Sequence, residues 1–190
     1  MRFIGMGNVM DEMRRRILRD IQVELSEEFD RNFERQGFFG ESWQRSRRSA
    51  DGGGSTLIDT GSLRRSLRSR VRGDGVEFWS DRPYAGIHNE GGEIVVTARM
   101  KRFFWAKYYE AQGGLGRKKD GRLSNTKKNR RLSGAAEFWH QMALKKVGSK
   151  IVIPRRMFLG WSAGVSKIVE RVIDEELERL EAPLPPGGGV

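Results

Sequence analysis

Apolar residues recur at every fourth position along the first 36 residues, with charged side chains between them. This spacing predicts an amphipathic helix from about residue 8 to residue 36, ending before Gly37. The stripe consists of Met13, Ile17, Ile21, Leu25, Phe29 and Phe33. We expect it to pack on the core. A helix of this length measures roughly 42 Å, more than a small domain covers, so we expect part of the stripe to contact a neighbouring subunit.

A second apolar face predicts a closing helix over residues 163–180, with Ser162 or Ser166 as its N-cap. That face consists of Val165, Ile168, Val169, Val172, Ile173, Leu177 and Leu180. The residues beyond it are rich in proline and glycine and cannot continue a helix. We expect residues 183–190 to form a flexible tail and residues 1–182 to form a single domain.

Three stretches have the pattern of β-strands. Residues 71–80 hold a Gly-Asp-Gly turn signal between two short strand patterns. Residues 93–98 are rich in β-branched side chains, and residues 149–154 end at Pro154. The pattern therefore predicts an α+β fold. We expect one small, mainly antiparallel sheet packed by the long N-terminal helix and the C-terminal helix.

The stretch 57–67 predicts a turn that launches a short helix reaching residue 70. Asp59 and Thr60 carry side-chain oxygens that can accept hydrogen bonds from the unpaired N–H groups of a helix start. Gly61 allows a tight backbone at this turn. Leu63 is expected to open the apolar face of this helix, while the neighbouring arginines fall off that face.

The remaining segments between residues 84 and 147 are mostly predicted to be helical. Residues 84–90 indicate one short helical turn, closed by Gly91. Residues 99–111 are aromatic and basic and pair their aromatic side chains at helical spacing. Residues 135–147 show a further helical pattern.

Positive charge is concentrated between residues 112 and 134. The chain has a formal net charge of +11, which favours contact with polyanions. We expect this segment to be a flexible basic insertion. Its candidate contact residues are Arg117, Lys118, Lys119, Lys127, Lys128, Arg130 and Arg131. A second concentration of charge consists of Arg45, Arg47, Arg48, Arg64, Arg65, Arg68, Arg70 and Arg72. Each cluster suits non-specific DNA contact, an acidic protein ring, or only a solvated surface.

The sequence contains few candidates for a catalytic site. It has no cysteine, so a disulfide or thiolate metal site is excluded, and its two histidines, His88 and His140, are far apart in sequence. The Asp-Thr-Gly at 59–61 occurs once, so an aspartic protease would require a homodimer. We expect no enzyme activity, no cofactor and no metal. No apolar run approaches the length of a membrane span, and we expect a soluble protein made in the cytoplasm.

Three motifs stand in a particular order: Leu57-Ile-Asp-Thr-Gly-Ser-Leu63, Tyr84-Ala-Gly-Ile-His-Asn-Glu-Gly91 and Ile153-Pro-Arg-Arg-Met-Phe-Leu-Gly160. This order resembles the phage virion morphogenesis (tail-completion) family, from the first helix to about residue 180. The resemblance implies a structural protein of the virion that completes the tail or joins tail and head at the neck. It also implies assembly in the host cytoplasm into a closed ring, six-fold by analogy with tails. The implied partners are other copies of the chain, the tail tube or terminator, and neck or connector proteins.

The motifs and the neighbouring aromatic residues supply the candidate interface. They are Phe38, Phe39, Trp43, Asp59, Thr60, Gly61, Leu63, Tyr84, His88, Gly91, Pro154, Arg155, Arg156 and Phe158. The competing hypothesis is a basic nucleic-acid-binding module that uses the two basic clusters and the aromatic residues of 101–109.

Overall fold

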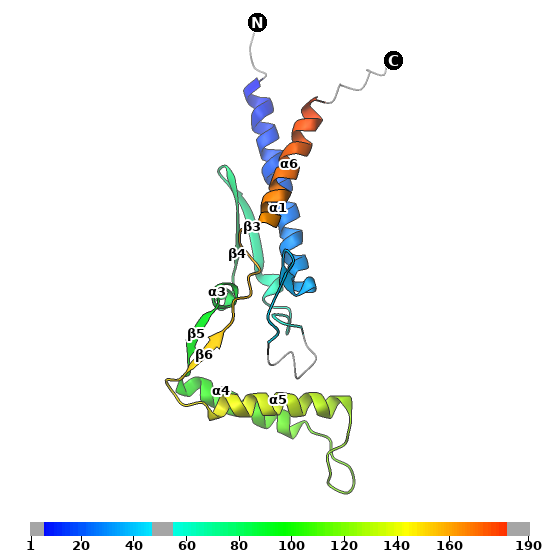
Figure 1. Ribbon diagram of the computed structural model, residues 1–190, viewed down its shortest axis with the longest axis vertical. Helices are drawn as coiled ribbons and strands as arrows, with labels where there is room; N and C mark the ends of the chain where they lie inside the picture. The colour runs from blue at the N-terminus through cyan, green and yellow to red at the C-terminus, as the bar shows by residue number, and fades with distance from the viewer. Residues whose placement is uncertain (1–5, 47–54, 182–190) are drawn as a thin grey trace.

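Two long helices form the upper half of the molecule. In the computed structural model, which describes residues 6–46 and 55–181, helix α1 spans Met6–Arg35 and helix α6 spans Ala163–Glu181. They pack against each other, and the first turn of α1 and the last turn of α6 lie at the same end of the molecule (Figure 1). Both helices were predicted, within a few residues of these bounds. The predicted tail at 183–190 and the arginines at 47 and 48 lie outside the described residues.

Helix α1 carries the core on one face, as its four-residue spacing predicted. Ile21, Leu25 and Phe29 are buried against α6, and Leu18, which the spacing did not include, is buried beside them. The helix ends at Arg35 because Gln36 adopts a left-handed conformation with φ 56°. A backbone of this shape turns the chain back, so the short strands β1 (Gly37–Phe38) and β2 (Glu41–Ser42) return beneath the helix.

Helix α6 is capped and buried at its N-terminal half. The backbone N–H of Val165 donates to the Ser162 hydroxyl at 3.3 Å, which confirms the predicted N-cap. Val165 and Val172 pack into the core with α1. One turn beyond Val172, Glu176 is only 1% exposed and accepts hydrogen bonds from Arg16 of α1 and Arg179 of α6. The upper contact between the two helices is therefore an ion pair rather than an apolar one.

A β-hairpin covers the other side of α1. Strand β3 (Leu67–Arg72) pairs with strand β4 (Gly75–Ser80) in the antiparallel register Leu67↔Ser80 to Arg72↔Gly75. The predicted turn at 73–75 is confirmed, and Phe78 packs edge-on against Phe29 with ring centroids 5.0 Å apart.

The predicted helix over 57–70 is wrong. Only Arg64–Ser66 forms a single 3₁₀ turn, η1, and strand β3 begins directly at Leu67. The reason lies in the alternation that follows: Leu67 and Ser69 are partly buried and face α1, while Arg68 and Arg70 are exposed. The hydroxyl of Ser69 contacts Gln22 and Ser26 of α1, and this two-residue period suits a strand rather than a helix.

The α+β class is confirmed, but the strands form three separate two-stranded antiparallel ribbons within the described residues, not one sheet. Strand β5 (Gly92–Val95) pairs only with β6 (Lys150–Ile153), in the register Gly92↔Ile153 to Val95↔Lys150. This ribbon leads away from the helices, so it cannot extend the β3–β4 hairpin (Figure 1).

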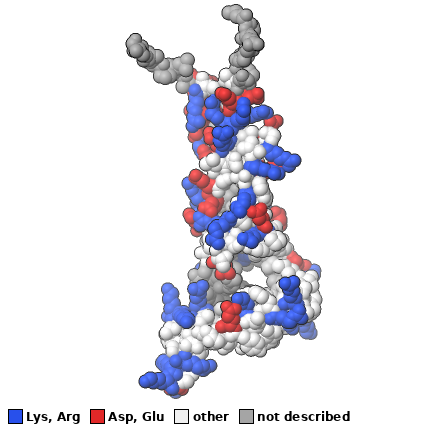
Figure 2. Space-filling view, turned by 180° about the vertical axis from the view of Figure 1, so that it is seen from behind, with Lys and Arg blue, Asp and Glu red and all other residues white. Residues whose placement is uncertain are grey.

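A helical hairpin stands at the far end of the β5–β6 ribbon (Figure 1). Helix α4 spans Ala98–Gly113 and helix α5 spans Lys127–Leu144, and we call residues 98–144 the basic arm. The arm has an apolar interior of its own, in which Phe104 stacks on Trp139 and His140 contacts Trp105. Lysine and arginine side chains dominate its charged surface (Figure 2).

The predicted insertion at 112–134 is shorter than its sequence indicated. Thr126 caps α5 by accepting from the N–H of Asn129 at 3.1 Å, so Lys127 and the basic residues after it lie on the helix. The side chain of Asn129 is buried and bonds both backbone groups of Gly116 and the carbonyl of Ser124. The loop between the helices is therefore tied to the start of α5.

We predict that the α1–α6 ion pair makes stability depend on acidity. Burial raises the pKa of Glu176, but hydrogen bonds from Arg16 and Arg179 outweigh burial and hold this pKa below its ordinary value of 4.5. The folded state thus binds this proton less readily than the unfolded state. Its contribution to stability is full above pH 4.5 and is lost as the pH falls through the lowered folded pKa.

The measurement is the melting temperature between pH 7 and pH 3. Glu176→Gln should melt several degrees lower than the wild type at pH 7 and show a flatter acid limb. Glu178→Gln is the matched control, because Glu178 is exposed on the same helix. If the melting temperatures of the wild type and of Glu176→Gln changed with pH in parallel, the acid dependence would not come from Glu176.

Candidate functional site

The three sequence motifs meet at one place, below the lower end of α1. A buried cluster joins side chains from five separate parts of the chain, and it consists of Phe33, Trp43, Leu63, Ala85 and Phe158. The ring of Phe33 lies 5.4 Å from the rings of both Trp43 and Phe158, and Phe33 has no exposed surface. We call this cluster, with the hydrogen bonds around it, the motif junction.

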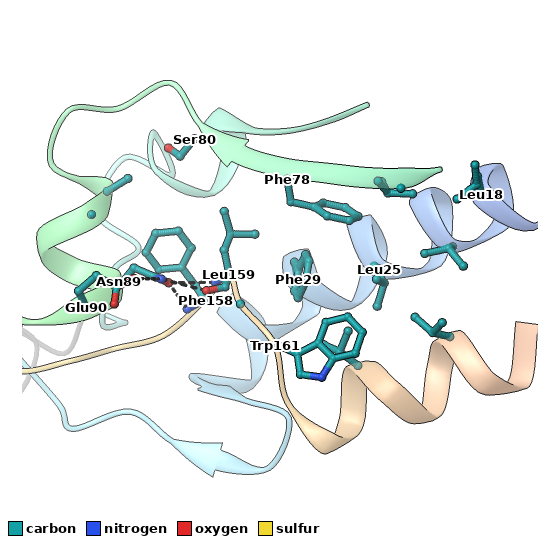
Figure 3. A pocket seen from close by; sticks show the side chains of 18 of the residues that line it. Leu18, Leu25, Phe29, Phe78, Ser80, Asn89, Glu90, Phe158, Leu159 and Trp161 are labelled. Atoms are coloured by element: carbon teal, nitrogen blue, oxygen red, sulfur yellow. Dashed lines mark hydrogen bonds between the residues drawn. The ribbon is translucent and has the colours of Figure 1, made fainter. Parts of the chain in front are cut away.

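One asparagine holds two of the motifs together. Asn89 lies on the short helix α3 (Ala85–Glu90), and its Oδ1 accepts from the backbone N–H groups of Phe158 and Leu159 at 2.9 and 3.0 Å. Its Nδ2 donates to the carbonyl of Leu159 at 2.9 Å (Figure 3). A single amide thus satisfies three backbone groups of a segment about 70 residues away. Asn89 was not among the residues predicted from the sequence, and its only signal there was its place inside the second motif.

The arginine and tryptophan of the junction make similar ties. Arg156 is buried, and its Nε donates to the carbonyl of Gln44 at 2.8 Å. The backbone N–H of Arg156 donates to the carbonyl of His88 at 2.8 Å. Trp43 Nε1 donates to the carbonyl of Met157 at 2.7 Å. These bonds hold the irregular chain after β2 to the third motif.

The surroundings of His88 in the junction favour its neutral form. Burial lowers its pKa from the ordinary value of 6.5, and the positive charge of Arg156 lowers it further. Burial also lowers the pKa of Arg156. A histidine beside a buried guanidinium is a poor cation ligand, and no group of three His, Cys, Asp or Glu side chains in the described part of the chain could hold a metal ion. The arrangement suits packing rather than proton transfer.

The first motif is tied to α1 by charge. Arg64 Nε donates to Asp30 at 2.5 Å, and a second nitrogen of Arg64 contacts both Asp30 and Glu34. The hydrogen bonds that Arg64 donates to Asp30 and then to Glu34 raise the pKa of Arg64 above its ordinary range. Arg64, which belongs to the second concentration of charge in the sequence, is therefore engaged within the chain.

At two positions in the motifs the backbone conformation requires glycine. Gly61 has φ 73°, and its carbonyl accepts from the N–H of Arg65 at 3.0 Å, while Arg65 also bonds the carbonyl of Thr60. Gly91 has φ 75°, and a Cβ there would lie 2.8 Å from the backbone nitrogen of Arg155. The turn before η1 and the close approach of α3 to the third motif both depend on these glycines.

The structure separates the predicted interface residues by exposure. Most are buried or half-buried inside the single chain, and these are Phe38, Phe39, Trp43, Gly61, Leu63, His88, Gly91, Pro154, Arg156 and Phe158. Four are exposed: Asp59, Thr60, Tyr84 and Arg155. The buried residues shape the junction from within, so a neighbouring molecule would meet mainly the surface that they support.

That surface includes an open apolar groove of about 690 Å³ (Figure 3). Its walls come from α1, β4, α3, the chain at 158–161 and the start of α6. Most of its lining is apolar and includes Leu18, Leu25, Phe29, Phe78, Phe158 and Leu159. Trp161 lies along the groove and is 69% exposed. A concave apolar surface with an exposed indole is the kind that binds an apolar partner.

We predict that Asn89→Ala destabilises the protein by about 2 kcal/mol or more, because it leaves the N–H groups of Phe158 and Leu159 without their partner. The measurement is the midpoint of urea unfolding. Asn125→Ala on the exposed loop of the arm is the matched control and should leave the midpoint unchanged. A loss of less than 0.5 kcal/mol, about the effect of an ordinary surface substitution, would show that Asn89 does not hold the motifs together.

Comparison with known proteins identifies the family of the chain. Searches of the curated proteins and of the solved structures each found no match. No helix within the described ranges is long and apolar enough to cross a membrane. The family model of phage virion morphogenesis matches residues 6–178, a range that contains both long helices, the motif junction and the basic arm. The chain therefore belongs to the phage virion morphogenesis family and has a structural role in virion formation.

Proposed function

We propose that the protein completes the phage tail or joins tail and head at the neck, and that it does so by assembling into a closed ring. The observation that carries this proposal is the apolar groove, which the described residues leave open and which is walled by two of the three motifs. Membership of the virion morphogenesis family supports the structural role. The ring would have six copies, by analogy with tails, and would contact the tail tube or terminator on one side and neck or connector proteins on the other.

The occupant that fits the groove is the exposed end of α6 from a second copy. Ile173, Leu177 and Leu180 lie on one helical face at spacings of four and three residues, and each is more than a third exposed. We call these three residues the α6 stripe. An amphipathic helix laid into an apolar groove is a recurring mode of protein recognition, with anchors at this spacing.

Such a contact would join two different surfaces, and the proposed ring requires head-to-tail association of this kind. The α6 stripe lies toward the C-terminal end of α6, whereas Trp161 of the groove lies just before the N-terminal end of this helix. A contact between two different surfaces leaves one stripe and one groove free on each pair of copies. Such head-to-tail association adds further copies until the ring closes.

The motif junction would support this contact indirectly. Asn89 holds Phe158 and Leu159 in place, and both side chains line the groove. Arg64 ties the first motif to α1, which forms another wall. The motif residues would therefore set the shape of the groove, while Trp161 and the α6 stripe would make the intermolecular contact.

The test is the double substitution Leu177→Glu and Leu180→Glu. We expect the wild type to form a ring whose mass in light scattering is a multiple of the single chain, and the double variant to have the mass of one chain, because two buried carboxylates oppose docking. Glu170→Gln on the same helix is the control and should assemble normally. Assembly of the double variant at wild-type concentrations, or a wild type that stays monomeric when concentrated, would contradict the proposal.

Engineered cysteines offer a second readout, since the chain has none of its own. A variant with both Leu177→Cys and Trp161→Cys should form a ladder of disulfide-linked multimers on oxidation. Either single-cysteine variant should stop at the dimer. A double-cysteine chain that forms no species larger than a dimer would argue against contact between the α6 stripe and the groove.

A further inference from the structure

The positive charge of the protein is concentrated in one element. The basic arm contains twelve lysines and arginines but only three acidic residues, Glu110, Asp120 and Glu137. Its formal charge is thus +9, out of +11 for the whole chain, although it comprises only residues 98–144. The rest of the molecule is close to neutral. Any long-range attraction for a polyanion therefore originates mainly in the arm.

The arginines of strand β3 are already engaged by carboxylates. Arg70 and Arg72 bind Glu77 across the β3–β4 hairpin, and Arg68 binds Asp81. Arg64 is bound to α1, as described above. The second basic cluster of the sequence analysis is therefore largely neutralised where the structure describes it. These pairs leave that surface with little net field.

The arm lacks such neutralisation. Its ion pairs among the described residues are Lys107 with Glu110 at 2.6 Å and Arg122 with Asp120 at 4.0 Å. The other ten cations have no carboxylate of a described residue within 4.0 Å. Those that are exposed at the loop and at the start of α5 are Arg117, Lys118, Lys119, Lys127, Lys128, Arg130 and Arg131. These are the seven basic contact candidates of the sequence, which the fold brings to one end of the arm.

We propose that the basic arm binds the phosphate backbone of nucleic acid, with duplex DNA as its ligand and without preference for base sequence. Ammonium and guanidinium groups on long side chains contact phosphates but carry no fixed pattern for reading bases. Helix α5 has 18 residues and is about 27 Å long. A duplex presents one phosphate charge per about 1.7 Å of its axis, so it can engage cations along the whole arm at once.

Two observations favour nucleic acid over an acidic protein. Besides the seven cations at one end, further lysines and arginines lie elsewhere on the arm (Figure 2), so its positive charge extends along its length and matches a long and uniformly charged polyanion. Phe103 and Tyr109 are exposed on α4, and Tyr109 is 64% exposed while stacked on Trp105. Aromatic faces among cations suit contact with sugars and bases as well as phosphates. This inference does not depend on ring formation, because the arm and the groove share no residue.

The experiment is the titration of a fluorescent random-sequence duplex with the full-length chain at several salt concentrations. The arm variant replaces Lys118, Lys119, Lys127 and Lys128 with Gln. We expect its affinity to fall at least tenfold near physiological salt, and the slope of log K against log salt to decrease by about 3 to 4, since each lost phosphate contact removes about one unit. The control variant replaces four exposed cations of the body with Gln: Arg15, Arg19, Arg45 and Lys167. Its affinity should stay within twofold of the wild type.

The other outcomes overturn the proposal. If the wild-type chain does not bind the duplex at low salt, the arm does not bind nucleic acid. The same conclusion follows if the body variant loses as much affinity as the arm variant. Poly-L-glutamate that competes as well as unlabelled duplex would assign the arm to an acidic protein. Tighter binding of the corresponding single strand, lost in Tyr109→Ser, would assign it to single strands. Unchanged circular dichroism and melting temperature verify that the arm variant is folded.

Discussion

The packing of the aromatic residues at the lower end of α1 is the interaction on which the rest of the structure depends. Phe29 belongs to the core shared with α6 and the β3–β4 hairpin, and Phe33, one turn later, belongs to the motif junction. Burying a phenylalanine side chain contributes about 1.5–3 kcal/mol, and each ring contacts segments that are distant in sequence. The two clusters are thus joined through one rigid helix, so the groove, which lies between them, keeps its shape only while α1 is packed.

The motif junction shows how the residues of the three motifs hold separate segments of the chain together. Its polar groups are directed at backbone groups: Asn89 at the chain of Phe158 and Leu159, Arg156 at Gln44, and Trp43 at Met157. Such bonds join irregular segments that have no ladder of their own, and leaving a buried backbone group unpaired is costly. Because Gly91 must approach Arg155 closely, the spacing between the second and third motifs is also set by steric contact. The junction therefore needs side chains of a particular size and bonding capacity.

The molecule divides its charge between two parts with different surroundings. In the body, arginines and carboxylates alternate along α1 and across the β3–β4 hairpin, and they neutralise one another at short range. In the arm the cations have few partners and must be solvated or bound by something else. Exposed pairs of the first kind add little to stability, whereas unpaired cations held on a helical hairpin create a field that extends about a Debye length into solution.

The sequence by itself determined the elements whose signal is local: the two long helices, the hairpin turn at 73–75, the helical turn before Gly91 and the aromatic helix of 99–111. Their periodicity and capping depend on neighbours a few residues away, and the order of the motifs indicated the family.

Tertiary structure decided the rest. Whether 67–72 formed a helix or a strand depended on its pairing with 75–80, and whether the strands formed one sheet depended on where the β5–β6 ribbon leads. The partners of Asn89 and Arg64 were also set by contacts across large sequence separations, which no local pattern encodes.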